Sequence, residues 1–200
     1  MPENPIIKHA LSLIENDDPK VLGLTFGAAK VKPGEKIPKG GESALNPRPA
    51  LHMPCDYFAN RVLSSWLEAQ GLPKLAFPAL SGDYLVVSVD LDAPFPSFAP
   101  LSPVLHWIQS SLRADPTTDV LTSSEAPIAS WVGPGPPPIS SPHRYVFLLY
   151  KQPTDFDAGK FTKEGGRGFG IRDRIRFDLP KFEKEAKLGP AIAASYFLSN

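Results

Sequence analysis

The sequence contains one cysteine, Cys55, in 200 residues, so an internal disulfide is impossible. This excludes the small secreted proteins that depend on several disulfides, and it makes the cytoplasm the expected location. No apolar run approaches the roughly 18 residues that a membrane-spanning helix needs. The first residues, MPENPIIKHALSLIEN, also lack the long apolar stretch and early positive charge of a signal peptide. We therefore expect peripheral membrane contact at most.

Neither sign of charge is in excess, because 21 lysine and arginine residues balance 21 aspartate and glutamate residues. The densest basic stretch is RDRIR, residues 172–176, and Asp173 interrupts it. A nucleic-acid-binding protein normally carries a basic stripe or patch. We therefore expect no nucleic-acid partner.

The sequence also lacks the common signatures of catalysis. It has no G-x-S-x-G motif for a nucleophilic serine. The stretch GPGPPP lacks the Lys-Ser/Thr ending of a Walker phosphate loop, and its prolines remove backbone N–H donors. Asp90, Asp92, His106 and His143 are of types that ligate metals, yet none of their spacings resembles H-x-x-x-H. We expect neither a metal nor another cofactor.

Proline, by contrast, is abundant: 24 prolines and 15 glycines make up 39 of the 200 residues. This share lies below the roughly 25–30% that indicates disorder, so it is typical of a folded domain with many loops. We find no repeat and no linker, and we expect one domain over residues 1–200. Helical spacing of apolar residues predicts helices within 1–20, over 56–70 and from about Pro180.

Alternating apolar residues predict strands between these helices. The predicted strands are 21–31, 83–94, 104–112, 144–151 and the final apolar stretch AIAASYFLS. Long connections separate them, including 33–49 and an expected exposed loop over 153–174. This pattern predicts a mainly β fold, an antiparallel β-sandwich with a few short peripheral helices.

Two acidic side chains lie near the end of one predicted strand. Asp90 and Asp92 would face the same side if the strand continues through both of them. They could then line a pocket that receives an ammonium group or a metal. Alternatively, DLDAP is a strand end at which aspartate accepts hydrogen bonds from its own backbone, and this interpretation is favoured.

Two histidines also attract attention. His143 precedes a strand and would share one face with Tyr145. His106 lies within the apolar run LHWI and would share a face with Ile108. A lone histidine in such a run is usually a core residue with one hydrogen bond, whereas a histidine where a loop meets a strand often binds a ligand.

The stretch VGPGPPPISSPHRY leads into His143. Gly133 and Gly135 keep their backbone N–H donors and can place them close to a ligand, while the prolines fix the loop. One interpretation is a rigid cradle for an anion. The other is simply a stiff connection between two strands.

Three stretches, SVDLDAPFP, LHWI and VGPGPPPISSPHRYVFLLYKQP, resemble the phosphatidylethanolamine-binding protein family, in both order and spacing, from about residue 84 to 152. That family includes the Raf kinase inhibitor protein, plant flowering-time regulators and fungal carboxypeptidase Y inhibitors. The resemblance implies a β-sandwich with one anion pocket. It places the following residues at that pocket: Asp90, Asp92, Pro94, His106, Gly133, Gly135, Pro136, His143 and Tyr145.

The resemblance also carries structural implications. Pro94 would follow a cis peptide bond, and Arg144 would point away from the pocket and support structure. DLDAP stands here in place of the commoner DPDAP. Mammalian members carry a C-terminal helix that borders the pocket, and because this sequence stops at Asn200 we expect that wall to be absent or replaced.

The function implied is non-enzymatic binding of a small anion, such as phosphate or a phospholipid headgroup, in a protein that regulates a protease or a signalling enzyme such as a kinase. One alternative is inhibition of a serine carboxypeptidase through the N-terminal segment and surface loops. A second alternative is a metal- or acid–base-dependent hydrolase that uses Asp90, His106 and His143.

Overall fold

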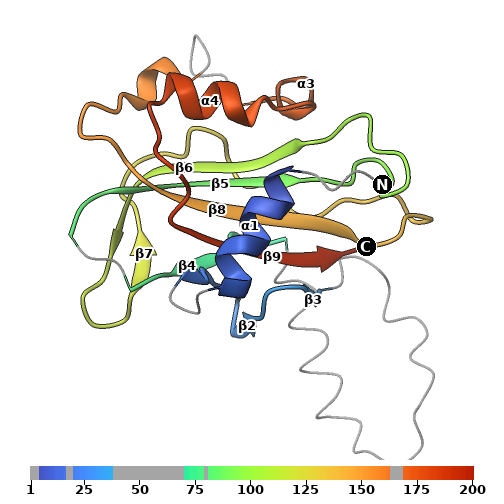
Figure 1. The fold of residues 1–200 in the computed structure, drawn as a ribbon, viewed down its shortest axis with the longest axis horizontal. Coiled ribbons are helices and arrows are strands. Elements are labelled where there is room, and N and C mark those ends of the chain that lie inside the picture. Colours follow the sequence, from blue (N-terminus) through green and yellow to red (C-terminus); the bar gives the residue numbers. More distant parts are fainter. Residues whose placement is uncertain (1–4, 17–19, 38–69, 79–80, 163–168) are drawn as a thin grey trace, which may run out of the picture.

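The computed structural model describes residues 5–16, 20–37, 70–78, 81–162 and 169–200. Within these ranges the chain is mainly β, as expected, with short helices on the outside (Figure 1). The helix predicted over 56–70 and most of the loop 33–49 lie outside the described residues, except that Gln70 is described.

The described strands form one continuous sheet. Along the chain they are β1 (Gly23–Phe26), β2 (Ala29–Val31), β3 (Glu35–Lys36), β4 (Lys74–Ala76), β5 (Tyr84–Asp90), β6 (Val104–Ala114), β7 (Val120–Thr122), β8 (His143–Lys151) and β9 (Ala193–Ser199). Their order across the sheet is β2-β1-β4-β7-β6-β5-β8-β9-β3. The sheet is mixed, because β3 pairs with β9 in parallel whereas the other neighbours are antiparallel.

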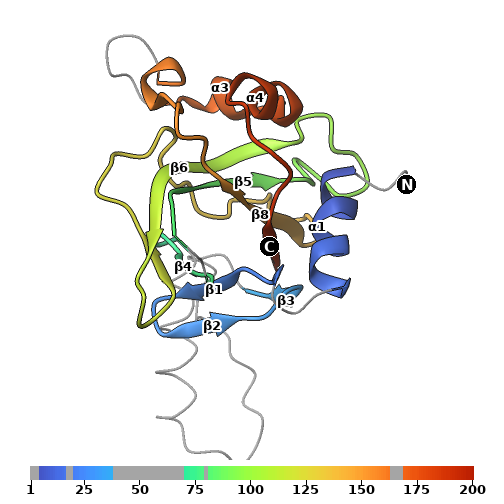
Figure 2. The same ribbon diagram turned by 60° about the vertical axis from the view of Figure 1, so that its left-hand side comes forward.

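The long strand β6 explains why this is not the predicted sandwich of two antiparallel sheets. Its first part pairs with β5, and its end, at Arg113 and Ala114, pairs with β7. Just before this change of partner, at a register shift in the β5 pairing, Ser111 adopts a left-handed backbone conformation, with φ of 55°. One strand therefore belongs to both halves, and the sheet curls until the halves face each other (Figure 2).

Two hydrophobic clusters lie on opposite faces of the β5–β6–β8–β9 half. The interior cluster lies between the two halves of the sheet, where Leu24 and Leu75 face Phe147 and Phe197. The outer cluster lies under α1 (Pro5–Asn16) and α4 (Leu179–Glu185), which contribute Ala10, Phe182 and neighbouring side chains. Strand β5 is buried on both faces and contributes to both clusters, so its polar end is held between two packed layers.

The segment 21–31 differs from the single strand that was predicted. It is a hairpin, in which β1 and β2 pair antiparallel with Phe26 opposite Ala29. Gly27 supplies the positive φ, 56°, that a two-residue hairpin turn needs. Apolar alternation runs through both strands and so conceals the turn.

The C-terminal elements agree in part with the predictions. The expected short helix is α4, capped by Asp178, whose side chain accepts a hydrogen bond from the Lys181 N–H. The stretch 153–174 is not entirely an exposed loop, since it contains a 3₁₀ turn and helix α3 (Ile171–Arg174), whose last residue is buried. No helix in the described ranges is long and apolar enough to span a membrane.

Candidate functional site

The two aspartates of the DLDAP segment do not form one pocket wall. Strand β5 ends at Asp90, so Asp92 lies in the following bend and not on the same strand face. The Asp90 carboxylate accepts a hydrogen bond from the Asp92 backbone N–H at 2.8 Å. This confirms the interpretation of DLDAP as a strand end. The Ala93–Pro94 peptide bond is cis, as the family resemblance implied.

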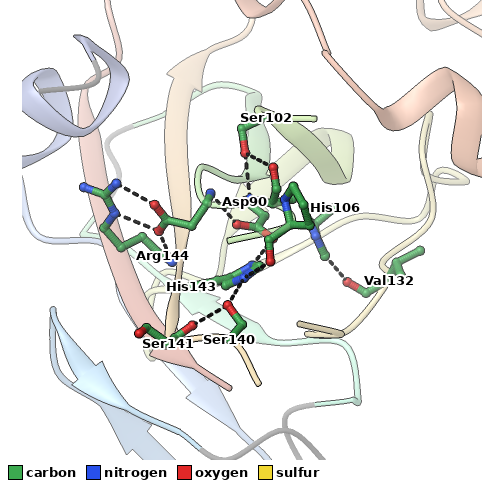
Figure 3. Close-up of polar contacts among 11 residues, drawn as sticks. Asp90, Ser102, His106, Val132, Ser140, Ser141, His143 and Arg144 are labelled. Carbon is green, nitrogen blue, oxygen red and sulfur yellow. Dashed lines mark hydrogen bonds and ion pairs between the residues drawn. The ribbon is translucent and has the colours of Figure 1, made fainter. Parts of the chain in front are cut away.

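Asp92 is committed to Arg144. Its carboxylate accepts hydrogen bonds from the backbone N–H, Nε and Nη2 of Arg144, at 2.8, 2.8 and 2.6 Å. The Asp92 side chain is almost fully buried, while Arg144 is half-buried. The pairing raises the pKa of the Arg144 guanidinium further, so the guanidinium stays charged at any ordinary pH. As expected, Arg144 points away from His143 (Figure 3).

His143 is held on both sides of its ring. Its Nδ1 lies 2.8 Å from an Asp90 carboxylate oxygen, and its Nε2 lies 2.9 Å from Ser140 Oγ and 3.1 Å from the Pro94 carbonyl oxygen (Figure 3). The ring is 1% exposed. His143 thus links the end of β5, the Pro94 bend and the loop before β8, and both of its nitrogens already have protein partners.

His106 lies at a bulge in β6, and this overturns its predicted placement with Ile108. The β5–β6 register passes from Ser88 opposite Trp107 to Val89 opposite Leu105, so His106 has no partner residue on β5. The bulge interrupts the alternation. Ile108 therefore packs in the outer cluster, whereas the His106 ring lies edge-on to Tyr145, with ring centroids 5.0 Å apart, on the interior side.

One nitrogen of His106 has a clear partner. Its Nδ1 lies 2.5 Å from the carbonyl oxygen of Val132, the residue before Gly133 (Figure 3). No hydrogen bond to Nε2 exists within the described part of the chain, and Nε2 is not among the enclosed polar atoms. Burial lowers the pKa of the His106 imidazole, although the Val132 carbonyl and Asp90 oppose this change.

Tyr145 lies on β8 between the two histidines. Its ring stacks on His143 at 6.4 Å and on Phe197 at 5.1 Å, and the residue is fully buried. Its hydroxyl nevertheless has no hydrogen-bond partner among the described residues. Burial raises the pKa of this hydroxyl, with a smaller opposing effect from the nearby backbone N–H of Gly135. The hydroxyl is therefore a protonated, unused donor.

The Gly-Pro loop behaves differently at its two glycines. A Cβ added to Gly133 would lie 3.0 Å from the Gln70 Cα and 2.4 Å from its Oε1, and Gln70 also donates a hydrogen bond to the Pro134 carbonyl. A Cβ added to Gly135 would meet no atom of the described residues within 4 Å. Gly133 thus allows close packing against Gln70, whereas Gly135 borders open space.

We expect alanine substitution to destabilise the protein at Gly133 but not at Gly135. Gly133→Ala should displace the loop and lower the thermal midpoint by several degrees, because a ΔΔG of about 1 kcal/mol corresponds to roughly 2–4 °C in a chain of this size. Gly135→Ala should leave the midpoint unchanged, because the added Cβ would meet no described atom within 4 Å. Thermal unfolding of both variants tests this difference, and equal midpoints would contradict it.

Tyr150 provides a natural comparison for Tyr145, since both tyrosines are fully buried on β8. The Tyr150 hydroxyl donates a hydrogen bond to the Glu183 carboxylate of α4 at 2.7 Å. We expect Tyr150→Phe to lower the free energy of unfolding by about 1.5–3 kcal/mol, the usual worth of a hydrogen bond to a charged group.

Tyr145→Phe should change stability by less than about 0.5 kcal/mol, because it removes a hydroxyl that has no hydrogen-bond partner among the described residues. Urea unfolding of both variants gives the comparison. A loss for Tyr145→Phe as large as that for Tyr150→Phe would mean that the Tyr145 hydroxyl has a partner inside the protein.

Sequence reasoning missed several residues that build the site. Arg174 of α3 is 5% exposed and donates to the carbonyl oxygens of Leu105, His106 and Ser130 at 2.9–3.2 Å, and also to that of Phe169. The only sequence signal was its place in RDRIR, which was considered only as a basic stretch, and Arg174 fell at the end of the segment 153–174 predicted as an exposed loop. In fact this guanidinium fixes the backbone on both sides of the His106 bulge.

Other contributors carry no distinctive sequence signal. The Ser140 hydroxyl donates to the Ser141 carbonyl and also bonds His143. The Trp131 ring packs against His106, with ring centroids 6.0 Å apart. The Trp131 indole N–H is enclosed and lacks a partner within the described ranges. In that same part of the chain, no three His, Cys, Asp or Glu side chains gather closely enough to hold a metal ion.

This fold and this set of motifs define a family. The family model described as "Phosphatidylethanolamine-binding protein" matches residues 28–197, and the chain belongs to that family.

Curated relatives include the carboxypeptidase Y inhibitor of Saccharomyces cerevisiae. It is 33% identical over an alignment of 134 residues, and this alignment covers 57% of this chain and 58% of the inhibitor. Phomoidride biosynthesis cluster protein N of Talaromyces stipitatus is 36% identical over an alignment of 104 residues, which covers 48% of this chain and 50% of that protein. The chain thus spans about half the length of the curated relatives it matches.

Solved structures share the fold at lower identity. The carboxypeptidase Y inhibitor, crystallised with its cognate proteinase, superposes with a TM-score of 0.62 at 23% identity, over 90% of this chain and 82% of that one. The phosphatidylethanolamine-binding protein of Plasmodium vivax superposes with a TM-score of 0.57 at 12% identity, over 98% and 92%. These likenesses support the curled, mainly β fold described above.

Proposed function

We propose that this chain is a non-enzymatic binding protein whose pocket receives a small anion, such as phosphate or a phosphorylated headgroup. His106, Tyr145 and the backbone of Gly135 would contact the ligand. The three come from β6, β8 and the Gly-Pro loop, so the pocket would lie where the loop crosses the interior side of the sheet.

The observation that carries this proposal is the unpartnered hydroxyl of Tyr145. Buried polar groups in folded proteins are nearly always hydrogen-bonded. Here a fully buried hydroxyl has no partner among the described residues, and it lies beside a histidine with an unused nitrogen and a glycine that borders open space. A ligand with acceptor oxygens would satisfy the hydroxyl.

The remaining predicted site residues would position these contacts. Asp90 orients His143, whose ring stacks on Tyr145, and Pro94 supplies a carbonyl to the same histidine. Asp92 acts one step further away, through Arg144.

The Gly-Pro loop has a similar positioning role at two further residues. Gly133 follows the carbonyl that holds His106 and packs on Gln70. Pro136 is buried and fixes the loop next to Gly135. Neither residue needs to touch the anion in order to shape its site.

The test is calorimetric titration of inorganic phosphate into the wild-type protein and into Tyr145→Phe. We expect the variant to bind about tenfold more weakly, because one hydrogen bond to a charged ligand is lost. Tyr150→Phe is the matched control, since its hydroxyl faces α4, and it should bind like the wild type. Equal affinity of wild type and Tyr145→Phe would refute the proposed pocket.

A second candidate function is inhibition of a serine carboxypeptidase. It is favoured by the 33% identity to the yeast inhibitor and by the fold shared with an inhibitor that was crystallised with its proteinase. The structure refines the test. Helix α1 packs into the outer cluster through the fully buried Ala10, so truncation should stop before Pro5 to spare the fold.

The corresponding experiment measures inhibition of carboxypeptidase Y by the full chain and by a chain that lacks residues 1–4. Inhibition that weakens on truncation would support a role for the N-terminal segment. Inhibition that is unchanged would place the contact on surface loops, and a full chain that does not inhibit would remove this candidate for that enzyme.

A further inference from the structure

We propose that the pocket selects an oxyanion that still carries a proton, such as inorganic phosphate, which keeps a P–O–H near pH 7, or the monoanion of a phosphate monoester, because His106 offers it an acceptor nitrogen. This inference rests on the proposed function and specifies its ligand class. It assigns complementary roles to two side chains: Tyr145 would donate to the anion, and His106 would accept from it.

The hydrogen bond of His106 fixes its tautomer. A carbonyl oxygen can only accept, so the 2.5 Å contact between Nδ1 and the Val132 oxygen requires the proton on Nδ1. A neutral imidazole carries one N–H, and its other nitrogen is then an acceptor. Nε2, which has no hydrogen-bond partner in the described part of the chain, therefore presents a lone pair to a ligand.

The surroundings keep this ring neutral near pH 7. The charged and titratable groups that influence it are Asp90 on β5, His143 on β8 and Arg174 on α3. Burial is the main cause that lowers the pKa of His106. Arg174 and His143 act in the same direction, while the Val132 carbonyl and Asp90 oppose it. The net pKa lies below the ordinary value of about 6.5.

Tyr145 is the titratable neighbour whose ring packs edge-on against His106. Burial raises the pKa of its hydroxyl, so this group stays a donor across the neutral range. The pocket thus combines a donor hydroxyl with an acceptor nitrogen. A protonated phosphate complements both, since its bare oxygens accept and its P–O–H donates to Nε2. A fully deprotonated oxyanion would instead bring an oxygen lone pair against the lone pair of Nε2.

Charge alone predicts that the pocket prefers the more highly charged, fully deprotonated oxyanion. The buried guanidinium of Arg174 lies behind His106 with carbonyl oxygens as its hydrogen-bond partners, and a positive charge attracts a dianion more strongly than a monoanion. A preference for protonated phosphate over unprotonated sulfate would therefore come from hydrogen-bond complementarity.

Phosphate and sulfate separate the two effects, because they are similar in shape but only phosphate retains a proton near neutral pH. We expect calorimetry on the full chain at about pH 7 to give phosphate at least a tenfold tighter affinity, the worth of one hydrogen bond to a charged group. The difference in affinity should narrow as the pH falls through the lowered pKa of His106. The imidazole then takes up a proton, and Nε2 becomes a donor that sulfate can use.

Two variants and one spectrum complete the test. His106→Gln should lose the phosphate preference, whereas His9→Gln, an exposed histidine of α1, should keep it. The ¹⁵N spectrum of the wild-type histidine rings should show Nε2 of His106 unprotonated at pH 7, and this reading does not depend on the folding of any variant.

The outcomes are distinguishable. Equal affinity for both anions, tighter sulfate, or a protonated Nε2 at pH 7 would overturn this inference and leave the anion pocket standing. Binding of neither anion would overturn the inference and the proposed function together.

Discussion

Replacing Asp92 with alanine is expected to lower the free energy of unfolding by about 3–5 kcal/mol, the range found when one partner of a buried ion pair is removed. The Asp92 carboxylate is almost fully buried and accepts three hydrogen bonds from Arg144. Without it, the half-buried guanidinium and one backbone N–H lose their acceptors at the start of β8. Urea unfolding, analysed for midpoint and slope, measures the loss.

The matched control is Asp83→Ala, because Asp83 also pairs with an arginine through Nε and Nη2. That pair is solvent-exposed: the side chains of Arg113 and Asp83 are 75% and 33% exposed. Water replaces the lost contact there, so the change should be far smaller. If both substitutions destabilise the protein equally, burial is not the reason for the importance of Asp92.

Arg174→Met is expected to lower stability by on the order of 3 kcal/mol, because four backbone carbonyls each lose a donor, while that of His106 keeps a second one, the Val132 N–H. It should also raise the pKa of His106, since a positive charge that disfavours the imidazolium is removed. Urea unfolding and NMR titration of the histidine rings measure the two effects.

Arg172→Met provides the control on the same helix, where Arg172 is exposed. It should change neither stability nor the His106 titration. A His106 pKa that stays constant in Arg174→Met would show that the guanidinium does not act electrostatically on the site, even if the variant is destabilised.

Much of the fold follows from local patterns in the sequence. Strands β5, β6, β8 and β9 form the buried centre, and their β-branched and aromatic residues indicated them directly. Helix α1 followed from helical spacing, and α4 corresponds to the short helix predicted from about Pro180. The short strands β4 and β7 were missed because three residues give too little alternation.

The curled sheet could not be predicted, because it depends on β6 pairing with two partners far apart in sequence. The prediction that His106 shares a face with Ile108 failed for a related reason. A bulge shifts every later side chain to the other face, and the run LHWI gives no sign of it. Local alternation held at His143 and Tyr145, where β8 is regular from end to end.

The sequence pointed to most of the residues that gather at the site. Only the structure shows which of them bond each other and which polar atoms are left for a ligand. Asp90 and His143 satisfy each other, and Asp92 satisfies Arg144, so three of the strongest candidates are occupied within the protein. The site groups that lack a partner among the described residues include the Tyr145 hydroxyl, the Trp131 indole N–H and His106 Nε2. Which polar atoms remain unpaired depends on tertiary contacts such as Val132 and Ser140, which no local pattern reveals.

The most direct test of the proposed function is an NMR titration of the wild-type protein with inorganic phosphate, followed at the Gly135 amide and the His106 ring. We expect saturable shifts at both. The signals of Lys160 and Lys187, which line a separate small hollow, should change little. Shifts confined to those lysines, or no saturable shift at Gly135 and His106, would contradict the pocket described here.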